Sequence, residues 1–200
     1  MSLRQRSGDG AGRLIWVRHG ESEGNRDRRF THSTEVPLTD NGRAQARNAA
    51  ERIHAQFAPI RVVASPYARA RETGEIIAAE LALPLSIDPE VREQHMGQLM
   101  GQPYDVALQD PAFNPQRRWE WRPPGGEALT DVQRRVVPAL LRLASVYPAQ
   151  DVVVVAHAGV LMAIEAHITG CWEQVLATAN AGIIVVEHHG GVFSTRPLIE

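Results

Sequence analysis

Two histidines and two arginines stand where predicted strands end, and together they could bind a phosphate group. Arg18 and His19 directly follow one apolar run, Arg69 comes shortly after a second, and His157 directly follows a third. Ligands of open α/β sheets bind beyond the carboxyl ends of the strands, so we expect these side chains to meet at one edge of a sheet. Helix N-termini expected after the second and third runs add free N–H groups and a positive dipole end. The pattern predicts a pocket for a phosphate dianion.

The chemistry open to such a pocket is phosphoryl transfer. A neutral imidazole is a competent nucleophile toward phosphorus, and guanidinium groups beside it lower its pKa and neutralise oxygens that carry charge in the transition state. No metal ion is then required. The leaving alkoxide still needs a proton, which predicts a carboxylic acid held over the pocket. Among the acidic residues between 88 and 127, Glu93 is favoured because it comes soon after the turn at Asp88-Pro89 and is followed by Gly97.

The elements that must position these residues follow from the apolar pattern. Four runs have strand character, namely residues 14–17, 61–64, 152–156 and 183–187. Helical periodicity with suitable capping residues covers residues 39–57, 65–81, 130–144 and 159–168. Three of the strand runs are not interrupted by polar residues, which is typical of strands covered on both faces. We therefore expect an α/β three-layer sandwich, with a mostly parallel sheet flanked by helices.

The rest of the chain predicts one domain with a long excursion. Residues 1–12 have the composition of a disordered tail, and residues 13–200 contain no composition shift that would mark a linker. Residues 88–127 are rich in Pro, Gly, Gln and Trp, and only residues 104–108 have helical character. Long connections often form lids or binding loops, so we expect this excursion to cap the carboxyl ends of the strands.

Composition excludes several classes of function. The 21 basic residues are all arginine, which removes chemistry that needs a lysine, and a net charge of −2 gives no global attraction to nucleic acid or an anionic membrane. The single cysteine, Cys171, cannot form an internal disulfide, no apolar stretch approaches the roughly 20 residues of a membrane span, and no signal peptide is apparent. We expect a cytoplasmic protein.

The run Arg18-His19-Gly20-Glu21-Ser22, with Asn25 three residues later, resembles the signature of the histidine phosphatase superfamily, which includes cofactor-dependent phosphoglycerate mutases and broad-specificity phosphatases. Further segments resemble the motifs of that family in the right order, and they cover nearly the whole chain after the tail. They are residues 38–46, 65–73, 93–101, 124–127 and 153–159.

The resemblance implies a role for each matching residue. His19 would be phosphorylated and then dephosphorylated, Arg18, Arg69 and His157 would hold the phosphoryl group, and Glu93 would protonate the leaving oxygen and then activate water. The remaining predicted substrate-binding residues come from the matching segments and from a basic pair in the excursion; they are Asn25, Thr31, Ser65, Ala158, Arg117 and Arg118. No cofactor or metal ion is implied.

Three functions stay open at this point. Gly24 stands where mutases usually carry a tryptophan, and His32 where they carry a glycine, so we favour a metal-independent phosphomonoester hydrolase. A cofactor-dependent phosphoglycerate mutase is the alternative, because the same machinery serves both and Arg117-Arg118 could bind a second anionic group. A noncatalytic phospho-ligand binding module is the third, although the nucleophile and every residue of the phosphate grip are present.

The expected partner is a small phosphorylated substrate, with neither nucleic acid nor membrane. Arg26, Arg28 and Arg29 form a tight basic cluster, but no nucleic-acid-binding pattern accompanies them, and they could instead widen a positive rim. His188 and His189 are neighbours on a predicted strand end and point to opposite faces, so we expect surface residues rather than metal ligands. The sequence leaves a homodimer open.

Overall fold

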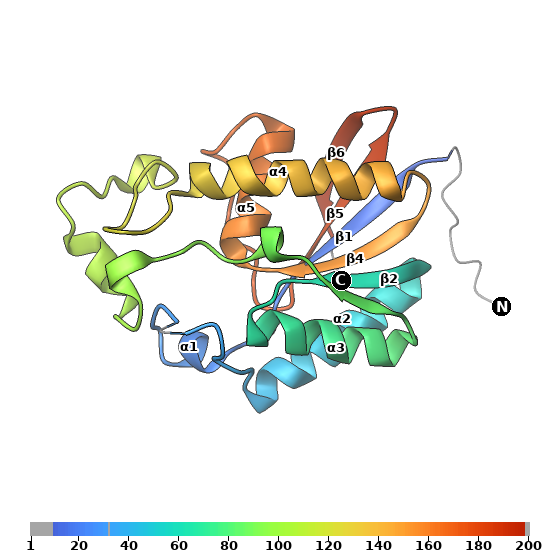
Figure 1. Cartoon of the computed structure of the whole chain (residues 1–200), viewed down its shortest axis with the longest axis horizontal. Coiled ribbons are helices and arrows are strands. Elements are labelled where there is room, and N and C mark those ends of the chain that lie inside the picture. Colours follow the sequence, from blue (N-terminus) through green and yellow to red (C-terminus); the bar gives the residue numbers. More distant parts are fainter. Residues whose placement is uncertain (1–9, 32, 199–200) are drawn as a thin grey trace.

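Within residues 10–31 and 33–198, which the computed structural model describes, the chain forms a six-stranded sheet between two layers of helices (Figure 1). The strands are β1 (Gly12–Arg18), β2 (Pro59–Ala64), β3 (Leu85–Ile87), β4 (Asp151–Ala156), β5 (Ile183–His189) and β6 (Val192–Pro197). Their order across the sheet is β3-β2-β4-β1-β5-β6. The first four strands in this order are parallel, whereas β5 and β6 are antiparallel to their neighbours. The predicted α/β sandwich is confirmed, with a mixed sheet.

The helices cover both faces of this sheet (Figure 1). They are α2 (Asp40–Gln56), α3 (Ala68–Leu81), α4 (Leu129–Val146) and α5 (Ala158–Thr169), whereas the short helix α1 (Glu23–Arg26) lies beyond the strand ends. Leu14 and Trp16 of β1 pack in one apolar cluster with α4 and α5, and Ile15 and Val17 pack in another with α2 and α3. All four side chains are fully buried, which contributes about 1.5–3 kcal/mol for each. Period-two alternation thus builds two cores from one apolar strand.

The excursion, residues 88–127, lies beyond the carboxyl ends of the parallel strands, as expected (Figure 1). The structure describes it throughout, and its regular pieces are four short 3-10 helices. These are η1 (Pro89–Val91), η2 (Gly97–Leu99), η3 (Tyr104–Gln109) and η4 (Pro115–Arg117). Besides side-chain contacts, separate backbone hydrogen bonds hold this segment, such as those from the Phe30 N–H to the Gln102 carbonyl and from the Gly101 N–H to the Phe30 carbonyl, both at 2.9 Å.

The start of α3 differs from the prediction. We expected Ser65-Pro66 to open this helix, but α3 begins at Ala68 and its N-cap is Tyr67. The Ser65 hydroxyl instead lies 2.7 Å from Nε2 of His157, and it accepts a hydrogen bond from the Tyr67 N–H. Ser65 therefore contacts His157 in the site instead of capping α3.

Two expectations at the far end of the sheet also need correction. Gly12 belongs to β1, where it pairs with His188, so the predicted tail reaches too far by at least this residue; residues 1–9 of that tail lie outside the described part of the chain. His188 is 6% exposed and is not a surface residue, whereas His189 is exposed. A Cβ atom on Gly12 would lie 2.3 Å from Cε1 of His188, so the missing side chain makes room for the imidazole.

Strands β3 and β6 and helix α1 were not predicted. β3 is three residues long, and β6 is an edge strand of mixed polarity in which most residues are exposed. Neither has the apolar run or the clean alternation by which a strand is recognised. Among the helices that the structure describes, none is long and apolar enough to cross a membrane.

Candidate active site

His19 lies directly after β1 and is fixed on both ring nitrogens. Its Nδ1 is 2.7 Å from the carbonyl oxygen of Gly20, and Nε of Arg69 donates to its Nε2 at 3.1 Å. A carbonyl can only accept and a guanidinium N–H can only donate, so Nδ1 carries the proton and Nε2 carries the lone pair. This single neutral tautomer has its nucleophilic nitrogen facing a cation.

The surroundings of His19 favour the same neutral form. Burial lowers its pKa well below the ordinary histidine value, and the positive charges of Arg69 and Arg18 lower it further. Burial and Arg69 likewise lower the pKa of His157 well below that value. Both imidazoles are therefore neutral near pH 7, and His19 is a nucleophile without a separate base.

His157 lies beneath the nucleophile, at the N-cap of α5. Its ring is fully buried, and it makes an edge contact with the ring of His19, with centroids 5.1 Å apart. The Ser65 hydroxyl bonds its Nε2, while its buried Nδ1 has no hydrogen-bond partner within the described residues. The sequence-predicted residues Ser65, His19 and His157 are thus brought together.

The two predicted arginines leave bonding capacity for an anion. Arg69, in the first turn of α3, is 3% exposed, and its buried Nη1 has no partner within the described part of the chain. Nη1 of Arg18 donates to the Thr178 carbonyl at 2.6 Å, which fixes that side chain beside His19. A buried cation with an unused donor favours an anionic ligand, because burial without one is costly.

Glu93 approaches the site from the excursion, next to the N-terminus of α5. Its Oε1 accepts a hydrogen bond from the Gln94 N–H at 2.8 Å. A Cβ atom on Gly159 would lie only 2.7 Å from this oxygen and 3.0 Å from Cδ2 of Leu129. The glycine in the last motif therefore leaves the space that the Glu93 carboxyl group occupies.

Arg135 of α4 holds the segment that carries Glu93. Its guanidinium donates to the backbone carbonyls of Glu90 and Glu93, at 2.8 and 3.0 Å, and to both carboxylate oxygens of Glu127, at 3.0 and 3.1 Å. The Glu127 carboxylate in turn accepts from the His95 N–H at 2.9 Å. Glu93 is thus attached through Arg135 and Glu127 to a regular helix.

Asn25 links α1 to both halves of the site. Its Nδ2 donates to the Tyr104 hydroxyl of the excursion at 3.2 Å, and its Oδ1 accepts from Nδ2 of Asn180 at 3.1 Å and from the Ser22 N–H. Asn180 also donates to the backbone carbonyl of His19 at 3.2 Å. Asn25 and Asn180 therefore fix the nucleophile relative to the excursion.

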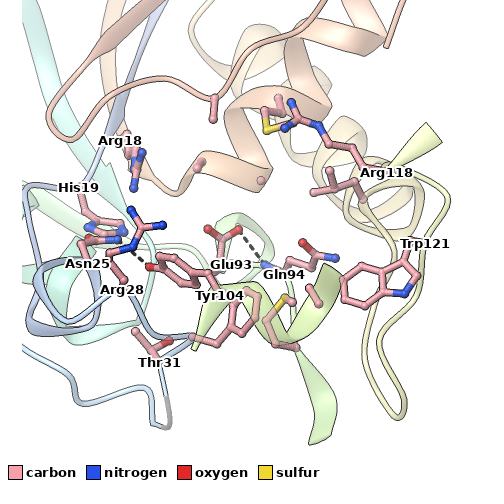
Figure 2. A pocket seen from close by; sticks show the side chains of 18 of the residues that line it. Arg18, His19, Asn25, Arg28, Thr31, Glu93, Gln94, Tyr104, Arg118 and Trp121 are labelled. Carbon is pink, nitrogen blue, oxygen red and sulfur yellow. Dashed lines mark hydrogen bonds between the residues drawn. The ribbon is translucent and has the colours of Figure 1, made fainter. Parts of the chain in front are cut away.

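A cavity of about 540 Å³ opens between these residues (Figure 2). Figure 2 shows Arg18, His19 and Asn25 on one side, Trp121 and Arg118 on the other, and Glu93 between them. The predicted residues Thr31, Ala158 and Arg118 line this cavity, together with Arg69. Arg117 is not among its described lining residues; it is exposed and forms an ion pair with Glu120.

Sequence reasoning missed several lining residues as members of the site: Phe30, Tyr104, Leu108, Phe113, Trp121 and Asn180. They lie outside the family-like motifs or at positions without a chemical signature. Arg28 lines the cavity, as the expectation of a widened positive rim allowed, and it has a positive φ of 52°. Within the described residues, no group of three or more His, Cys, Asp or Glu side chains could hold a metal ion.

Comparisons with known proteins agree with this geometry. The Histidine phosphatase superfamily (branch 1) matches residues 14–198. A glucosyl-3-phosphoglycerate phosphatase of Mycolicibacterium vanbaalenii is 31% identical over 88% of this chain and 84% of its own length. A 2,3-bisphosphoglycerate-dependent phosphoglycerate mutase of Gloeobacter violaceus is 35% identical over 76% of this chain and 73% of its own.

Solved structures give the same result at the level of the fold. A mycobacterial glucosyl-3-phosphoglycerate phosphatase in complex with VO3 superposes with a TM-score of 0.83 and 27% identity, covering 94% of this chain and 98% of the other. YhfR of Bacillus stearothermophilus gives a TM-score of 0.84 at 27% identity, covering 93% and 96%. Four of the family-like segments contribute residues to one cavity, and this chain belongs to the histidine phosphatase superfamily, whose matching relatives are phosphatases and mutases.

Proposed function

We propose that this protein is a metal-independent phosphomonoester hydrolase that acts through a phosphohistidine on His19. The observation that carries the proposal is the neutral His19 tautomer, whose Nε2 lone pair faces the Arg69 guanidinium. When a phosphate dianion enters, the Arg69 donors move from Nε2 to the phosphoryl oxygens, and the lone pair is released for attack. The cation thus protects the nucleophile before binding and stabilises charge afterwards.

The reaction has two steps on this geometry. Nε2 of His19 forms a bond to phosphorus while the bond to the alcohol oxygen breaks, and the Glu93 carboxylic acid gives that oxygen its proton. Glu93, now a carboxylate, takes a proton from water, and the water oxygen displaces Nε2 from phosphorus. Inorganic phosphate leaves with His19 and Glu93 in their starting forms. Arg18, Arg69, His157 and the first-turn N–H groups of α5 at Ala158 hold the phosphoryl oxygens.

The region around Gly24 supports hydrolysis over the mutase alternative. A Cβ atom on Gly24 would lie 2.9 Å from Cγ2 of Thr31 and 3.2 Å from the Arg29 carbonyl oxygen. A side chain at this position, such as the tryptophan that mutases usually carry, would require the Thr31 side chain to shift. We therefore propose that this site differs from a phosphoglycerate pocket.

The noncatalytic alternative is disfavoured because the nucleophile, the acid and the cations are all in contact with one cavity.

The remaining predictions are proposals of the same kind. Arg118 would contact the distal part of the substrate, and Arg117 would act from outside the cavity wall only if its ion pair with Glu120 opened. Asn25 and Thr31 would contact the substrate where they line the cavity, and Ser65 would act by orienting His157. We place the enzyme in the cytoplasm, with a small phosphorylated substrate as its partner and homodimer formation left for measurement.

The first test measures phosphate release from a panel of phosphomonoesters in the presence of a chelator. A parallel coupled assay follows conversion of 3- to 2-phosphoglycerate with 2,3-bisphosphoglycerate present. We expect hydrolysis with little isomerisation, and label from the substrate on His19 after an alkaline quench and mass spectrometry. Strong isomerisation would establish the mutase instead. Folded protein that is silent in both assays and takes no label would point to the binding module.

A further inference from the structure

The part of the cavity remote from His19 has a composition unlike the part beside it. We define the apolar chamber as the region lined by Met96, Leu108, Phe113, Trp121, Leu129 and Met162. Figure 2 shows Trp121 across the cavity from Arg18 and His19, with Glu93 between them. A leaving group that receives its proton from Glu93 and points away from His19 therefore enters this chamber.

The aromatic wall of the chamber is held in one orientation. Nε1 of Trp121 donates to the Asp110 carboxylate at 3.0 Å, and the same carboxylate accepts from the Ala112 N–H at 2.8 Å. The Phe113 ring stands perpendicular to the indole, with centroids 5.1 Å apart. The polar atom of Trp121 is thus already bonded, and only ring carbon remains for a ligand.

Two polar side chains near the chamber each use one donor on a backbone carbonyl. Nε2 of Gln94 donates to the Glu127 carbonyl at 2.6 Å, and Nη2 of Arg118 donates to the Val175 carbonyl at 3.2 Å. A sugar or polyol would bury several hydroxyl groups against the methionine, leucine and aromatic side chains, which costs free energy when hydrogen bonds are not replaced. Apolar surface gains free energy in the same place.

The volume and the rim of the cavity agree with a ligand larger than a phosphorylated three-carbon acid. A cavity of about 540 Å³ is in the range that holds a ligand of drug size. Leu108, on the chamber wall, is 66% exposed, and Leu176, next to the lining residue Ala177, is 78% exposed. Met96 and Met162 give the wall adaptable side chains.

We propose, on the basis of the proposed hydrolase function, that the apolar chamber binds the alcohol part of the substrate and selects phosphomonoesters of apolar, aromatic alcohols over those of polyols. The substrate is a phosphate ester of an alcohol that carries about one or two rings. The phosphate end is recognised by charge, and the alcohol end by burial of apolar surface.

The test compares phenylpropyl phosphate with glycerol phosphate. Both are primary alkyl esters that need protonation by Glu93, so the chemical step is matched and the body of the alcohol differs. We expect kcat/KM for the phenylpropyl ester to be higher by about tenfold or more, since burial of one ring in a fitted pocket gives discrimination of this order. Equal values, or a preference for glycerol phosphate, would overturn the proposal.

Variants connect the preference to the chamber. Trp121→Ala should reduce the preference to within about threefold, because kcat/KM for the phenylpropyl ester should fall more than kcat/KM for glycerol phosphate. Leu108→Ser changes an exposed side chain, so it keeps the test valid if Trp121→Ala fails to fold, and it should lose part of the preference. The matched control is Leu141→Ser, a 47% exposed leucine of α4 that does not line the cavity. A preference unchanged in both chamber variants would contradict the proposal.

A binding measurement gives a second readout. Titration calorimetry with phenylpropylphosphonate and propylphosphonate should show tighter binding and a more negative heat-capacity change for the aromatic compound, which Leu108→Ser reduces. Identical heat-capacity changes would count against the chamber. Failure of the proposed function is distinguishable: neither ester would release phosphate and His19 would take no label. If glycerol phosphate is hydrolysed and labels His19 without any aromatic preference, only the present inference fails.

Discussion

The two halves of the cavity are built on different principles. His19, Arg69 and His157 stand at the ends of parallel strands or in the first turns of the following helices, where the sheet fixes their positions. Glu93 and Trp121 lie in the excursion, whose short 3-10 helices supply little backbone support. Backbone hydrogen bonds to residues 28–30 and side-chain bonds such as those of Arg135 hold the excursion instead. The phosphate-binding half is thus fixed by the topology of the sheet, and the leaving-group half by individual hydrogen bonds outside the sheet.

The largest expected effect is in the phosphate-binding half. His19→Ala should lower kcat/KM by more than about 10⁴-fold for alkyl and aryl phosphates alike, because it removes the nucleophile. The fold should remain, since Asn180 and Ala181 bond the backbone carbonyl of residue 19 rather than its ring. Steady-state kinetics and thermal unfolding check both points, with His167→Ala, an exposed histidine of α5, as the control. Hydrolysis near the original rate would remove His19 from the mechanism.

Arg69→Gln should lower kcat/KM by about 10²- to 10³-fold, since it removes a donor to the charge that develops in the transition state. It also removes a charge that lowers the pKa of His19, so that pKa rises. His19 must be neutral to attack, and the variant should therefore lose activity at a higher pH than the original enzyme.

A ratio of rates isolates this pH effect. The ratio of original to variant kcat/KM should grow as the pH falls from about 8 to 5.5, because substrate ionisation cancels in the ratio while His19 of the variant becomes protonated first. Arg71→Gln, a partly exposed arginine of the same helix, is the control. A ratio that does not change with pH would separate Arg69 from the ionisation of His19.

The leaving-group half should respond differently. Glu93→Gln should lower the rate constant of His19 phosphorylation by about 10²-fold for alkyl phosphates and by no more than about threefold for nitrophenyl phosphate, whose leaving group needs little protonation, while hydrolysis of the phosphohistidine slows equally for both. The comparison of the two esters in pre-steady-state kinetics checks the assignment, with Glu90→Gln as the control. Equal losses of the phosphorylation rate on both esters would place Glu93 in the phosphate-binding half instead.

The smallest effect is expected from removing Arg135, which attaches the excursion to α4. Arg135→Ala should lower the rate constant of His19 phosphorylation by alkyl phosphates about tenfold, change KM little and spare phosphorylation by nitrophenyl phosphate, because the backbone around Glu93 loses its anchor. A merely structural role would lower both rates together. Arg134→Ala, the exposed neighbour in sequence, provides the control. An unchanged alkyl-to-aryl ratio would show that Glu93 is held without Arg135.

The same division explains what the sequence could predict. The residues of the phosphate-binding half sit beside uninterrupted apolar runs, so strand ends alone place Arg18, His19 and His157 at one edge. Glu93 was found through its motif rather than through geometry. Trp121 and Asn180 carry no such signal, because their places depend on contacts in the folded chain: Trp121 with Asp110, 11 residues away, and Asn180 with the His19 carbonyl, 161 residues away.

Two expectations based on local sequence were wrong, because tertiary contacts determine the structure at these positions. Ser65-Pro66 has the form of a helix start, but the Ser65 hydroxyl is used on His157, and α3 begins later. His188 was expected at the surface from its place near a strand end, yet Gly12 on the next strand makes room to bury it. Each case needed a partner that only the tertiary structure supplies.

Gly159 has a consequence for engineering. Its missing side chain is the space into which the Glu93 carboxyl group fits. An alanine there would meet the end of a flexible side chain, which can swing aside at small cost to the fold. Such a protein would still accept the phosphoryl group from an activated aryl ester but would lack the base that activates water. Gly159→Ala is thus a design for a protein that stores the phosphohistidine, suited to isolating the intermediate or to passing the phosphoryl group to an added alcohol.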